Sequence, residues 1–589
     1  MASLEVVEVN ERLLLESEEP ISENGSDGPY TGDGSVEIKG NSILKHHTGN
    51  WKACFFILGT EYCERLAYFG IEKNLVTFLT TKLHEGNVSA ARNVTTWQGT
   101  CNLAPLVGAV LADSYWGRYW TITAFMAIYL IGMVTLTLTA SISALTPPAC
   151  VGFVCPEAIS AHVLYFLGLY LIALGSGGIR PCVLSFGADQ FDDADPLEKV
   201  RKGSFFNWFS FFGNLGSFIS ATYIVWVQDS YGWGLGFGIC ALSLGLAIGS
   251  FFLGSVFYRF QQHRGSPLTR VCQVIVASLR KWNIDIPHDG SLLYELPGET
   301  SAIKRCRKLE HTTDFKFFDK AATISNTDDK CKNFRNPWRL CTVTQVEELK
   351  IVLRMLPILA TGIVFYAANA QISSMFLEQG MFLDKSIGSF NIPPASLSTF
   401  VVISVTIWIP TYDIILVPSA RRFTGKDRGF SHLQRIGIGL FMSILSMVAA
   451  ALVERKRLEI SKAEGLVHQK VPVPMSILWQ MPEYFLIGAA EVFTIIGHVE
   501  FFYDQSPDAM RSLCTALYFV TVSLGNYLSS LVLSILTSIT TQGGKPGWIP
   551  DNLNEGHLDY FFWFITGLSF LNLLVFVYCA MRHQYKQAF

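Results

Sequence analysis

The sequence predicts an all-α polytopic membrane protein with twelve transmembrane helices in two lobes of six. Composition is the first reason: the 589 residues are 50% hydrophobic and only 16% charged, with a mean hydropathy of +0.32. A soluble chain usually carries about 25% charged residues. The second reason is a series of mostly apolar stretches of roughly 20 residues, the length that spans a bilayer. The third is a long polar segment in the middle, which divides these stretches into two equal sets.

Each lobe contains six predicted spans. The N-terminal set comprises residues 53–80, 97–113, 119–141, 161–186, 204–227 and 233–258. The C-terminal set comprises residues 346–375, 394–418, 436–453, 475–499, 511–539 and 558–579. Polar residues interrupt the first and the seventh spans, so hydropathy alone supports these two least.

The distribution of positive charge orients the helices. The polar segment 259–345 holds fifteen Lys and Arg against nine Asp and Glu, and the connection 419–435 holds five against one. Loops with an excess of positive charge stay in the cytosol, so an even number of spans places both termini there as well. The connection 454–474 is also basic although it falls on the outer side, which opposes this assignment.

The expected organisation is a cytosolic N-terminal tail (1–49), an N-terminal lobe (50–258), a cytosolic linker (259–345), a C-terminal lobe (346–580) and a cytosolic C-terminal tail (581–589). The net charge of −3 lacks the basic surplus of nucleic-acid-binding proteins. The soluble segments contain no P-loop, zinc-ligand spacing or nucleophile elbow. We therefore expect a lipid bilayer as the surroundings, no nucleic acid partner, no metal or organic cofactor, and no enzyme activity.

A motif follows the second predicted span. In the stretch GAVLADSYWGR, residues Gly108, Asp113, Gly117 and Arg118 resemble the signature loop of the major facilitator superfamily, whose fold has two six-helix lobes. Asp413, with two arginines after it, is a weaker counterpart in the second lobe. The expected role is to pair charges with helix ends at the cytosolic face. An ordinary tight turn, with arginines that extend to the membrane surface, is the alternative.

The first span carries three ionisable residues on one helical face. Glu61, Glu64 and Arg65 occupy positions i, i+3 and i+4, which are neighbours on a helix surface. Charged groups inside a membrane are energetically expensive and by default functional. Because one guanidinium neutralises only one of two carboxylates, one acid can stay ionised while the other takes up a proton. The spacing predicts proton coupling; a structural salt-bridge cluster, or a helix that faces a wet vestibule, is the alternative.

Two further charges fall at mid-membrane, one in each lobe. Arg180 lies in the fourth span, and Glu491 lies in the tenth with no oppositely charged residue near it in sequence. Such groups must face a partner on another helix or a water-filled cavity. Together they would give a central site a positive and a negative pole, which suits a zwitterionic ligand. The polar side chains that we expect to complete this site are Tyr68, Asn102, Asn214, Asn369 and Gln371.

Long motifs from about residue 35 to residue 580 resemble one transporter family. The stretch EYCERLAYFG at 61–70 is similar to the motif E-x-x-E-R-F-x-Y-Y-G of proton-dependent oligopeptide transporters. The stretches GGIRPCVLSFGADQFDD, WRLCTVTQVEELK and EFFYDQSPDAMRSLC resemble the plant nitrate transporter/peptide transporter family, most closely its di- and tripeptide branch. The chain is identified as a member of this family.

The resemblance implies a proton-coupled symporter of di- and tripeptides, a monomeric transport unit whose two lobes rock about a midplane site. It implies that Glu61, Glu64 and Arg65 couple proton binding to gating. It assigns Arg180 to the carboxylate of the peptide and Glu491 to its amino terminus. The pocket-lining positions that it implies are Tyr68, Asn214 and Gln371.

Several positions depart from the pattern of bacterial and animal peptide carriers. Glu72 stands in place of an arginine, Asn102 in place of a common tyrosine, and Ala370 in place of an acid. Arg180 replaces a lysine, and arginine cannot release its proton near neutral pH. The alternative is a proton-coupled carrier of nitrate, an amino acid, or a plant metabolite or hormone. Asn369 occupies the position of a histidine that nitrate carriers can use, which weakens the nitrate alternative. A binding protein without turnover is a third hypothesis.

The first residues bear on the location of the protein. Glu8 precedes Leu13-Leu14 by five residues, a pattern that loosely resembles an acidic dileucine signal for vacuolar delivery. The vacuolar membrane is therefore slightly favoured over the plasma membrane. Asn87-Val-Ser and Asn93-Val-Thr fall in the first predicted outer loop and are candidate glycosylation sites.

Overall fold

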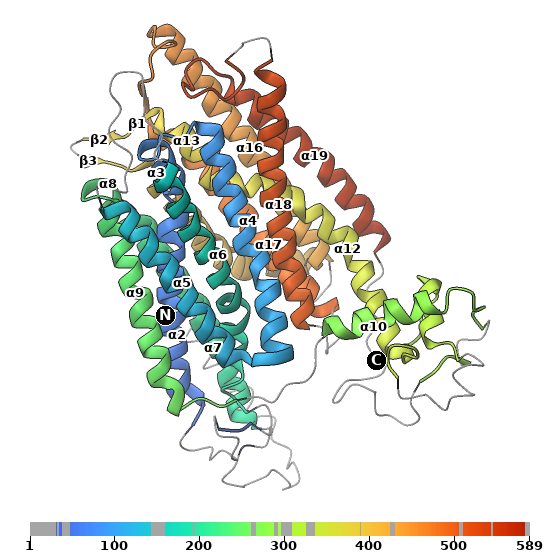
Figure 1. Ribbon diagram of the computed structural model, residues 1–589. Helices are drawn as coiled ribbons and strands as arrows, with labels where there is room; N and C mark the ends of the chain where they lie inside the picture. The colour runs from blue at the N-terminus through green and yellow to red at the C-terminus, as the bar shows by residue number, and fades with distance from the viewer. Residues whose placement is uncertain are drawn as a thin grey trace.

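The computed structural model describes residues 31, 35–37, 48–142, 159–192, 195–260, 267–287, 292–295, 309–324, 336–388, 390–424, 430–505, 511–542 and 546–583. Long helical segments run side by side through this part of the chain (Figure 1). The dileucine pattern at Leu13-Leu14 lies outside the described residues, as do nearly all of the N-terminal tail and the last six residues.

In the part of the chain that the structure describes, the long helical segments fall into two sets of six, one on each side of the linker. The N-terminal set is α2 (Asn50–Glu72), α4 (Asn87–Leu111), α5 (Arg118–Ser141), α6 (Ile159–Ala188), α7 (Pro196–Ile219) with its extension α8 (Val225–Ser230), and α9 (Trp233–Leu253). The C-terminal set is α12 (Val343–Asn369) with its extension α13 (Met375–Met381), α14 (Thr399–Thr411) with α15 (Val417–Thr424), α16 (His432–Ala463), α17 (Met481–Gln505), α18 (Arg511–Thr540) and α19 (Leu558–Arg582).

Nine of these segments are long and apolar enough to cross a membrane by composition alone, and α2, α4 and α17 are not among them. The physical reason is the polar content of these three helices. The charged trio at Glu61, Glu64 and Arg65 lies on α2, and Glu491 lies on α17. The seventh predicted span does qualify, as one stretch of 39 residues over Val343–Met381. The helices that hydropathy supports least are therefore largely those that carry the candidate site.

Several predicted boundaries were wrong. Residues 87–96 were expected in a loop, but α4 begins at Asn87; residues 454–463 were also expected in a loop, but α16 continues to Ala463. The first predicted span is broken after Glu72, and a short helix, α3 (Leu75–Thr81), follows the break. Hydropathy detects the part of a helix that lies in hydrocarbon, so polar ends that extend beyond it escape detection.

Close approach of α4 and α6 depends on glycines. A Cβ atom built on Gly108 would lie 2.2 Å from the backbone oxygen of Gly177 and 2.7 Å from the Cα of Gly178. The predicted motif residue Gly108 therefore acts through packing, because only a residue without a side chain allows the two backbones this close to each other.

Replacing Gly108 by alanine is expected to lower the free energy of unfolding by about 1–3 kcal/mol, because overpacking forces neighbouring backbones apart. The midpoint of thermal unfolding in detergent would measure this loss. The control is Gly245→Ala on α9, where an added Cβ meets nothing within 4 Å. This control should keep or raise the midpoint, since alanine favours a helix more than glycine does. Equal losses in the two variants would contradict the packing role of Gly108.

A π-helical turn occurs at corresponding places in both lobes. A π-helical turn over Ala112–Trp116 joins the end of α4 to α5, and a second over Tyr412–Leu416 joins α14 to α15. The first turn is followed by Gly117, whose φ of 76° favours glycine. The repetition supports the prediction that Asp413 lies in a counterpart of the first motif. The side chains of Asp113 and Asp413 themselves lie outside the described atoms.

The contacts of Arg118 are consistent with a charge that pairs with a helix end. Its guanidinium forms an ion pair with Asp189 and donates a hydrogen bond of 3.3 Å to the backbone oxygen of Ser185. Ser185 lies in the last turn of α6, and its carbonyl oxygen also accepts a 3.0 Å hydrogen bond from the backbone N–H of Asp189. A positive charge is favourable at this end of a helix, so Arg118 stabilises the junction of α5 and α6.

The linker between the lobes contains an ordered part that packs on α12. Helix α10 (Pro267–Arg280) and the 3-10 turn η6 (Lys316–Ala322) share a small hydrophobic cluster with the first turns of α12. Beside the cluster, the fully buried amino group of Lys350 lies 2.7 Å from Asp319 and 2.9 Å from Glu347. His311 completes a group of potential metal ligands there. Because Lys350 contacts both Asp319 and Glu347, these acids belong to a buried ion-pair network. This network attaches the linker to the C-terminal lobe.

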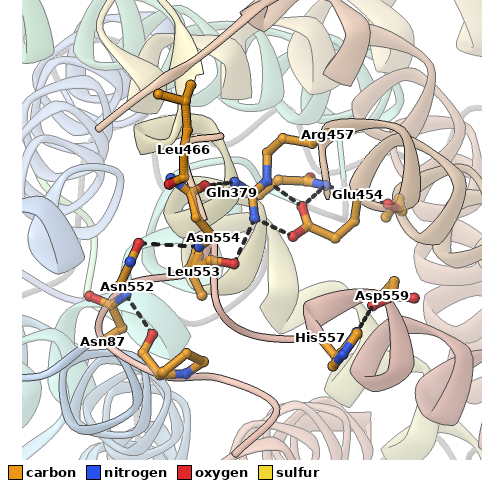
Figure 2. Close-up of polar contacts among 12 residues, drawn as sticks. Asn87, Gln379, Glu454, Arg457, Leu466, Asn552, Leu553, Asn554, His557 and Asp559 are labelled. Atoms are coloured by element: carbon orange, nitrogen blue, oxygen red, sulfur yellow. Dashed lines mark hydrogen bonds and ion pairs between the residues drawn. The ribbon is translucent and has the colours of Figure 1, made fainter. Parts of the chain in front are cut away.

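Short strands and a buried ion pair lie at the end of the C-terminal lobe that is opposite the linker. Strand β1 (Leu383–Asp384) pairs with β4 (Val473–Ser476) in parallel, and β2 (Ser386–Ile387) pairs with β3 (Phe390–Asn391) in an antiparallel hairpin. Figure 2 shows the fully buried Arg457 beside Glu454, with Nη2 2.6 Å from Oε1 and Nε 3.0 Å from Oε2. Arg457, which was predicted in a basic loop, is therefore a neutralised residue inside α16.

Candidate functional site

The three ionisable residues of α2 form a compact cluster, as predicted. The Nε atom of Arg65 lies 2.7 Å from Oε1 of Glu61 and 3.7 Å from Oε2 of Glu64. Both glutamates are at most 3% exposed. On the neighbouring α7, a Cβ built on Gly213 would lie 3.5 Å from Oε1 of Glu61 and 3.8 Å from Cγ of Arg65, so α7 packs directly against the cluster. One guanidinium therefore serves two carboxylates.

Arg180 of α6 belongs to the same cluster. Its Nε atom lies 3.5 Å from Oε1 of Glu64, and its guanidinium carbon lies 3.8 Å from the centre of the Tyr68 ring. Tyr68 stacks in turn on Trp97 of α4, with ring centres 5.6 Å apart. The indole of Trp97 donates a 2.8 Å hydrogen bond to the backbone oxygen of Leu169. Trp97 was not predicted as a site residue; an aromatic in an apolar span gives no signal of its own.

The guanidinium of Arg180 retains free hydrogen-bonding capacity. Its Nε and Nη2 atoms are buried and donate no hydrogen bond among the described residues, and both carboxylate oxygens of Glu64 accept none there. Buried polar atoms that lack a hydrogen bond destabilise a protein by about 1–3 kcal/mol each. Such atoms are expected where a ligand supplies the missing partner. Arg180 can therefore donate two hydrogen bonds to a carboxylate or a similar planar anion.

The negative pole lies on the other lobe. Oε1 of Glu491 on α17 accepts a 2.7 Å hydrogen bond from the amide of Asn369 on α12. This bond orients the carboxylate without neutralising it, because an amide carries no charge. Lys73 and Glu72, at the end of α2, are the charged groups of the other lobe that act on Glu491. The prediction that Asn369 and Glu491 belong to one site is consistent with this bond.

Three other predicted site residues stand apart from these clusters. The amide of Asn102 donates to the backbone oxygen of Gln98 in its own helix. Gln371 is fully buried and donates to Ser529 at 3.0 Å, so in this arrangement it packs the C-terminal lobe instead of lining a pocket. The side chain of Asn214 is exposed on α7, one residue after Gly213.

The two lobes are joined at the end of the bundle where α2 ends and α4 begins. The amide of Gln98 donates to Oε1 of Glu72 at 2.8 Å and to the hydroxyl of Ser373 at 2.6 Å, so it connects α4 to the turn after α12. The hydroxyls of Thr100 on α4 and Tyr527 on α18 lie 3.1 Å apart. In Figure 1 these two helices lie side by side between the lobes. None of these contacts was predicted, because each joins residues of different helices that lie far apart in sequence.

A second contact at this end involves a predicted glycosylation site. The backbone N–H of Asn87 donates to Asp551 at 3.1 Å, and its side-chain amide donates to the backbone oxygens of Pro550 and Asp551. Asn87 is only 3% exposed, so a glycan at Asn87 is incompatible with this arrangement. The side-chain amide of Asn93 on α4 donates a 2.9 Å hydrogen bond to Glu85 in the loop before that helix.

Comparison with known proteins identifies the family. The family model PTR2, described as POT family, matches residues 119–549. The chain belongs to the POT family. Protein NRT1/PTR FAMILY 8.3 of Arabidopsis thaliana is 60% identical over 560 residues, which are 95% of this chain and 96% of the relative. Protein NRT1/PTR FAMILY 8.1 of the same plant is 54% identical over 560 residues, which are 95% of this chain and 98% of the relative.

Solved structures of POT family transporters share the fold. The crystal structure of the POT family transporter PepTSo has a TM-score of 0.67 at 21% identity, covering 90% of this chain and 98% of that one. An auto-inhibited POT family peptide transporter gives a TM-score of 0.66 with the same identity. The chain is therefore an all-α polytopic membrane transporter of the POT family, and both the predicted family and the predicted fold class are confirmed.

Proposed function

We propose that this POT family protein is a proton-coupled symporter of di- and tripeptides that works by alternating access. The observation that carries the proposal is the pair of opposite poles on different lobes. Arg180 has donors without hydrogen-bond partners on the N-terminal lobe, and Glu491 is held by Asn369 on the C-terminal lobe. A short peptide has a carboxylate at one end and an ammonium group at the other. Its binding would satisfy both poles and draw the lobes together.

Nitrate fits this arrangement less well. An anion without a positive group would be attracted by Arg180 and repelled by the carboxylate of Glu491 while that carboxylate is ionised. The charge pattern therefore favours a zwitterion over nitrate. Proton-coupled transport of another small solute in the same family is the alternative; an amino acid would also present both charges, over a shorter span.

Competition for Arg180 provides a route to proton coupling. In the arrangement described, Glu64 lies between Arg65 and Arg180. When the carboxylate of a peptide binds Arg180, Glu64 shares that guanidinium with a second anion, and uptake of a proton would offset the added negative charge. One proton from the outer solution then binds to a carboxylate oxygen of Glu64. Release of the peptide on the cytosolic side restores the contact with Arg180, and the proton leaves to the cytosol.

We place the transport unit as a monomer in the vacuolar membrane with both termini in the cytosol. The basic linker and the basic connection after α15 support this orientation, and the dileucine pattern at Leu13-Leu14 supports the vacuole. With Arg457 buried against Glu454, the opposing charge of the connection after α16 is also reduced. The end of the bundle that Asn87 and Asp551 close is then the lumenal side.

Current recordings in oocytes test the substrate directly. The protein, with Leu13 and Leu14 replaced by alanine to favour the cell surface, would be exposed to a dipeptide or to nitrate at acidic external pH. We expect an inward current with the dipeptide and none with nitrate, and the current should decrease as the external pH rises. A current with nitrate alone would overturn the peptide assignment. Silence with both, once surface expression is verified, would indicate a different solute, and an amino acid series would then be applied.

A further inference from the structure

A buried acid that the site does not use lies at the lumenal end of the C-terminal lobe. Glu378 belongs to α13, the short helix that continues the line of α12. Its side chain is fully buried, and neither carboxylate oxygen has a hydrogen-bond partner among the described residues. A carboxylate in such surroundings has lost its hydration without gaining donors, which strongly disfavours the charged form. A protonated Glu378 fits this arrangement much better.

The helix that carries Glu378 lies at the contact between the lobes. Leu377, the residue before it, packs in the hydrophobic cluster of the N-terminal lobe although it belongs to the C-terminal lobe. Conversely, Ala91 of α4 packs in the cluster of the C-terminal lobe. Helix α13 contacts α3, and Figure 1 places the two at the same end of the molecule. Glu378 is therefore buried on a helix that itself contacts the other lobe.

Two charged groups act on Glu378 from neighbouring loops, Lys470 after α16 and Asp551 before α19. Lys470 attracts a carboxylate and Asp551 repels it. Asp551 also accepts the hydrogen bond from the backbone N–H of Asn87, at the start of α4, where a negative charge is favourable. An ionised Glu378 would place a second negative charge near the acid that joins the two lobes.

We propose that Glu378 is a proton-binding site that controls closure of the lumenal end of the transporter. When the lobes separate there, Glu378 gains water and ionises, releasing its proton to the lumen. When the lumen is acidic, a proton from that side binds one carboxylate oxygen, and the neutral side chain enters the contact between the lobes. The closed state thus binds one proton more than the open state, so its population falls as pH rises. This proton returns to the side from which it came, whereas the transported proton uses the cluster on α2.

The assignment of this end to the lumen rests on the proposed function, but the role of Glu378 in closure does not. The test of that role therefore uses a readout that needs no substrate. Spin labels at Lys82 and Glu464, exposed residues at this end of the two lobes, would report the distance between the lobes by electron paramagnetic resonance. The full chain would be used in lipid nanodiscs, with the exposed Cys272 replaced by serine. In the otherwise native chain, the population with the short distance should dominate at acidic pH and decline as pH rises.

The variant Glu378→Gln imitates the protonated acid and should keep the short distance at every pH. Glu378→Asp keeps a titratable group and should restore the pH dependence. The matched control is Glu85→Gln at the same end. Burial raises the pKa of Glu85, but its partner Asn93 belongs to the same lobe, so the control should respond to pH like the native chain. A pH response in Glu378→Gln that equals the native response would overturn the proposal.

Transport in proteoliposomes separates this role from proton coupling. With the substrate that the current recordings identify, Glu378→Gln should still accumulate it when a pH gradient is applied. Exchange of labelled for unlabelled substrate should lose its dependence on lumenal pH. Loss of accumulation with a retained pH response of the distance would overturn the proposal, because Glu378 would then belong to the coupling pathway. If the native chain transports no dipeptide, the proposed function fails, whereas the distance measurement still decides the role of Glu378.

Discussion

Replacing Glu491 by glutamine is expected to weaken the binding of a dipeptide by about 2–5 kcal/mol, the usual effect of removing one partner of a buried, hydrogen-bonded charge pair. Glutamine keeps the size of the side chain and can still accept the hydrogen bond from Asn369, so the variant removes charge with little change of shape. The concentration of dipeptide that gives half-maximal current should rise by about 30-fold or more, since each 1.4 kcal/mol is a factor of ten.

A chemical control on the substrate makes this prediction specific. An N-acetylated dipeptide has no ammonium group, so the native protein should transport it poorly. The preference for the free dipeptide should largely disappear in Glu491→Gln. The control on the protein is Glu483→Gln, which neutralises another fully buried acid of α17, one that bonds to Gln480 within its own lobe. If Glu491→Gln kept the native preference for a free amino terminus, the role of Glu491 as the negative pole would be wrong.

The arrangement of the spans was predictable because it depends on properties that a sequence shows directly. Apolar length identifies the hydrocarbon-crossing part of a helix, and a polar linker separates the lobes. The ends of the helices were not predictable in the same way. The polar start of α4 at Asn87 and the end of α16 near Arg457 are stabilised by contacts with distant loops, which hydropathy does not register.

The candidate site was predictable where one helix holds the group and less so where several helices meet. Helical spacing places Glu61 and Arg65 together, and the structure agrees. The contact of Arg180 with Glu64 joins two helices that are far apart in sequence, and neither the spacing nor the family resemblance predicted it. Gln371 is buried against Ser529 in this arrangement, and sequence alone does not reveal which face of a helix turns into the lobe.

Glu378 was missed because of a boundary. The seventh predicted span ended at residue 375, which left this acid in a loop, where a charge needs no explanation. In the structure α13 continues to Met381, and Glu378 on it is fully buried. An acid within a few residues of the predicted end of a span therefore merits the same attention as one at its centre.

Replacing Arg457 by methionine is expected to destabilise the protein by about 3–5 kcal/mol, because it leaves the fully buried Glu454 without its counter-ion. Methionine fills much of the same volume, so the loss comes mainly from the unpaired charge. Arg457 also donates to the backbone oxygen of Leu553 at 2.9 Å and bonds to Asn554. The loop before α19 should therefore loosen together with the C-terminal half of α16. Thermal and denaturant unfolding in detergent would measure the loss, and faster hydrogen exchange around Asn554 would locate it.

A double variant separates the unpaired charge from the lost contacts. Replacing both Arg457 and Glu454 by methionine removes the pair together, and apolar replacements of buried ion pairs are often neutral or stabilising. The double variant should therefore recover most of the stability that Arg457→Met loses. The control is Arg455→Met on the same helix, whose exposed pair with Glu459 has a separation of 3.4 Å and should contribute at most about 1 kcal/mol. If the double variant were as unstable as Arg457→Met, the bonds to Leu553 and Asn554, and not the charge of Glu454, would account for the stability of this end of the lobe.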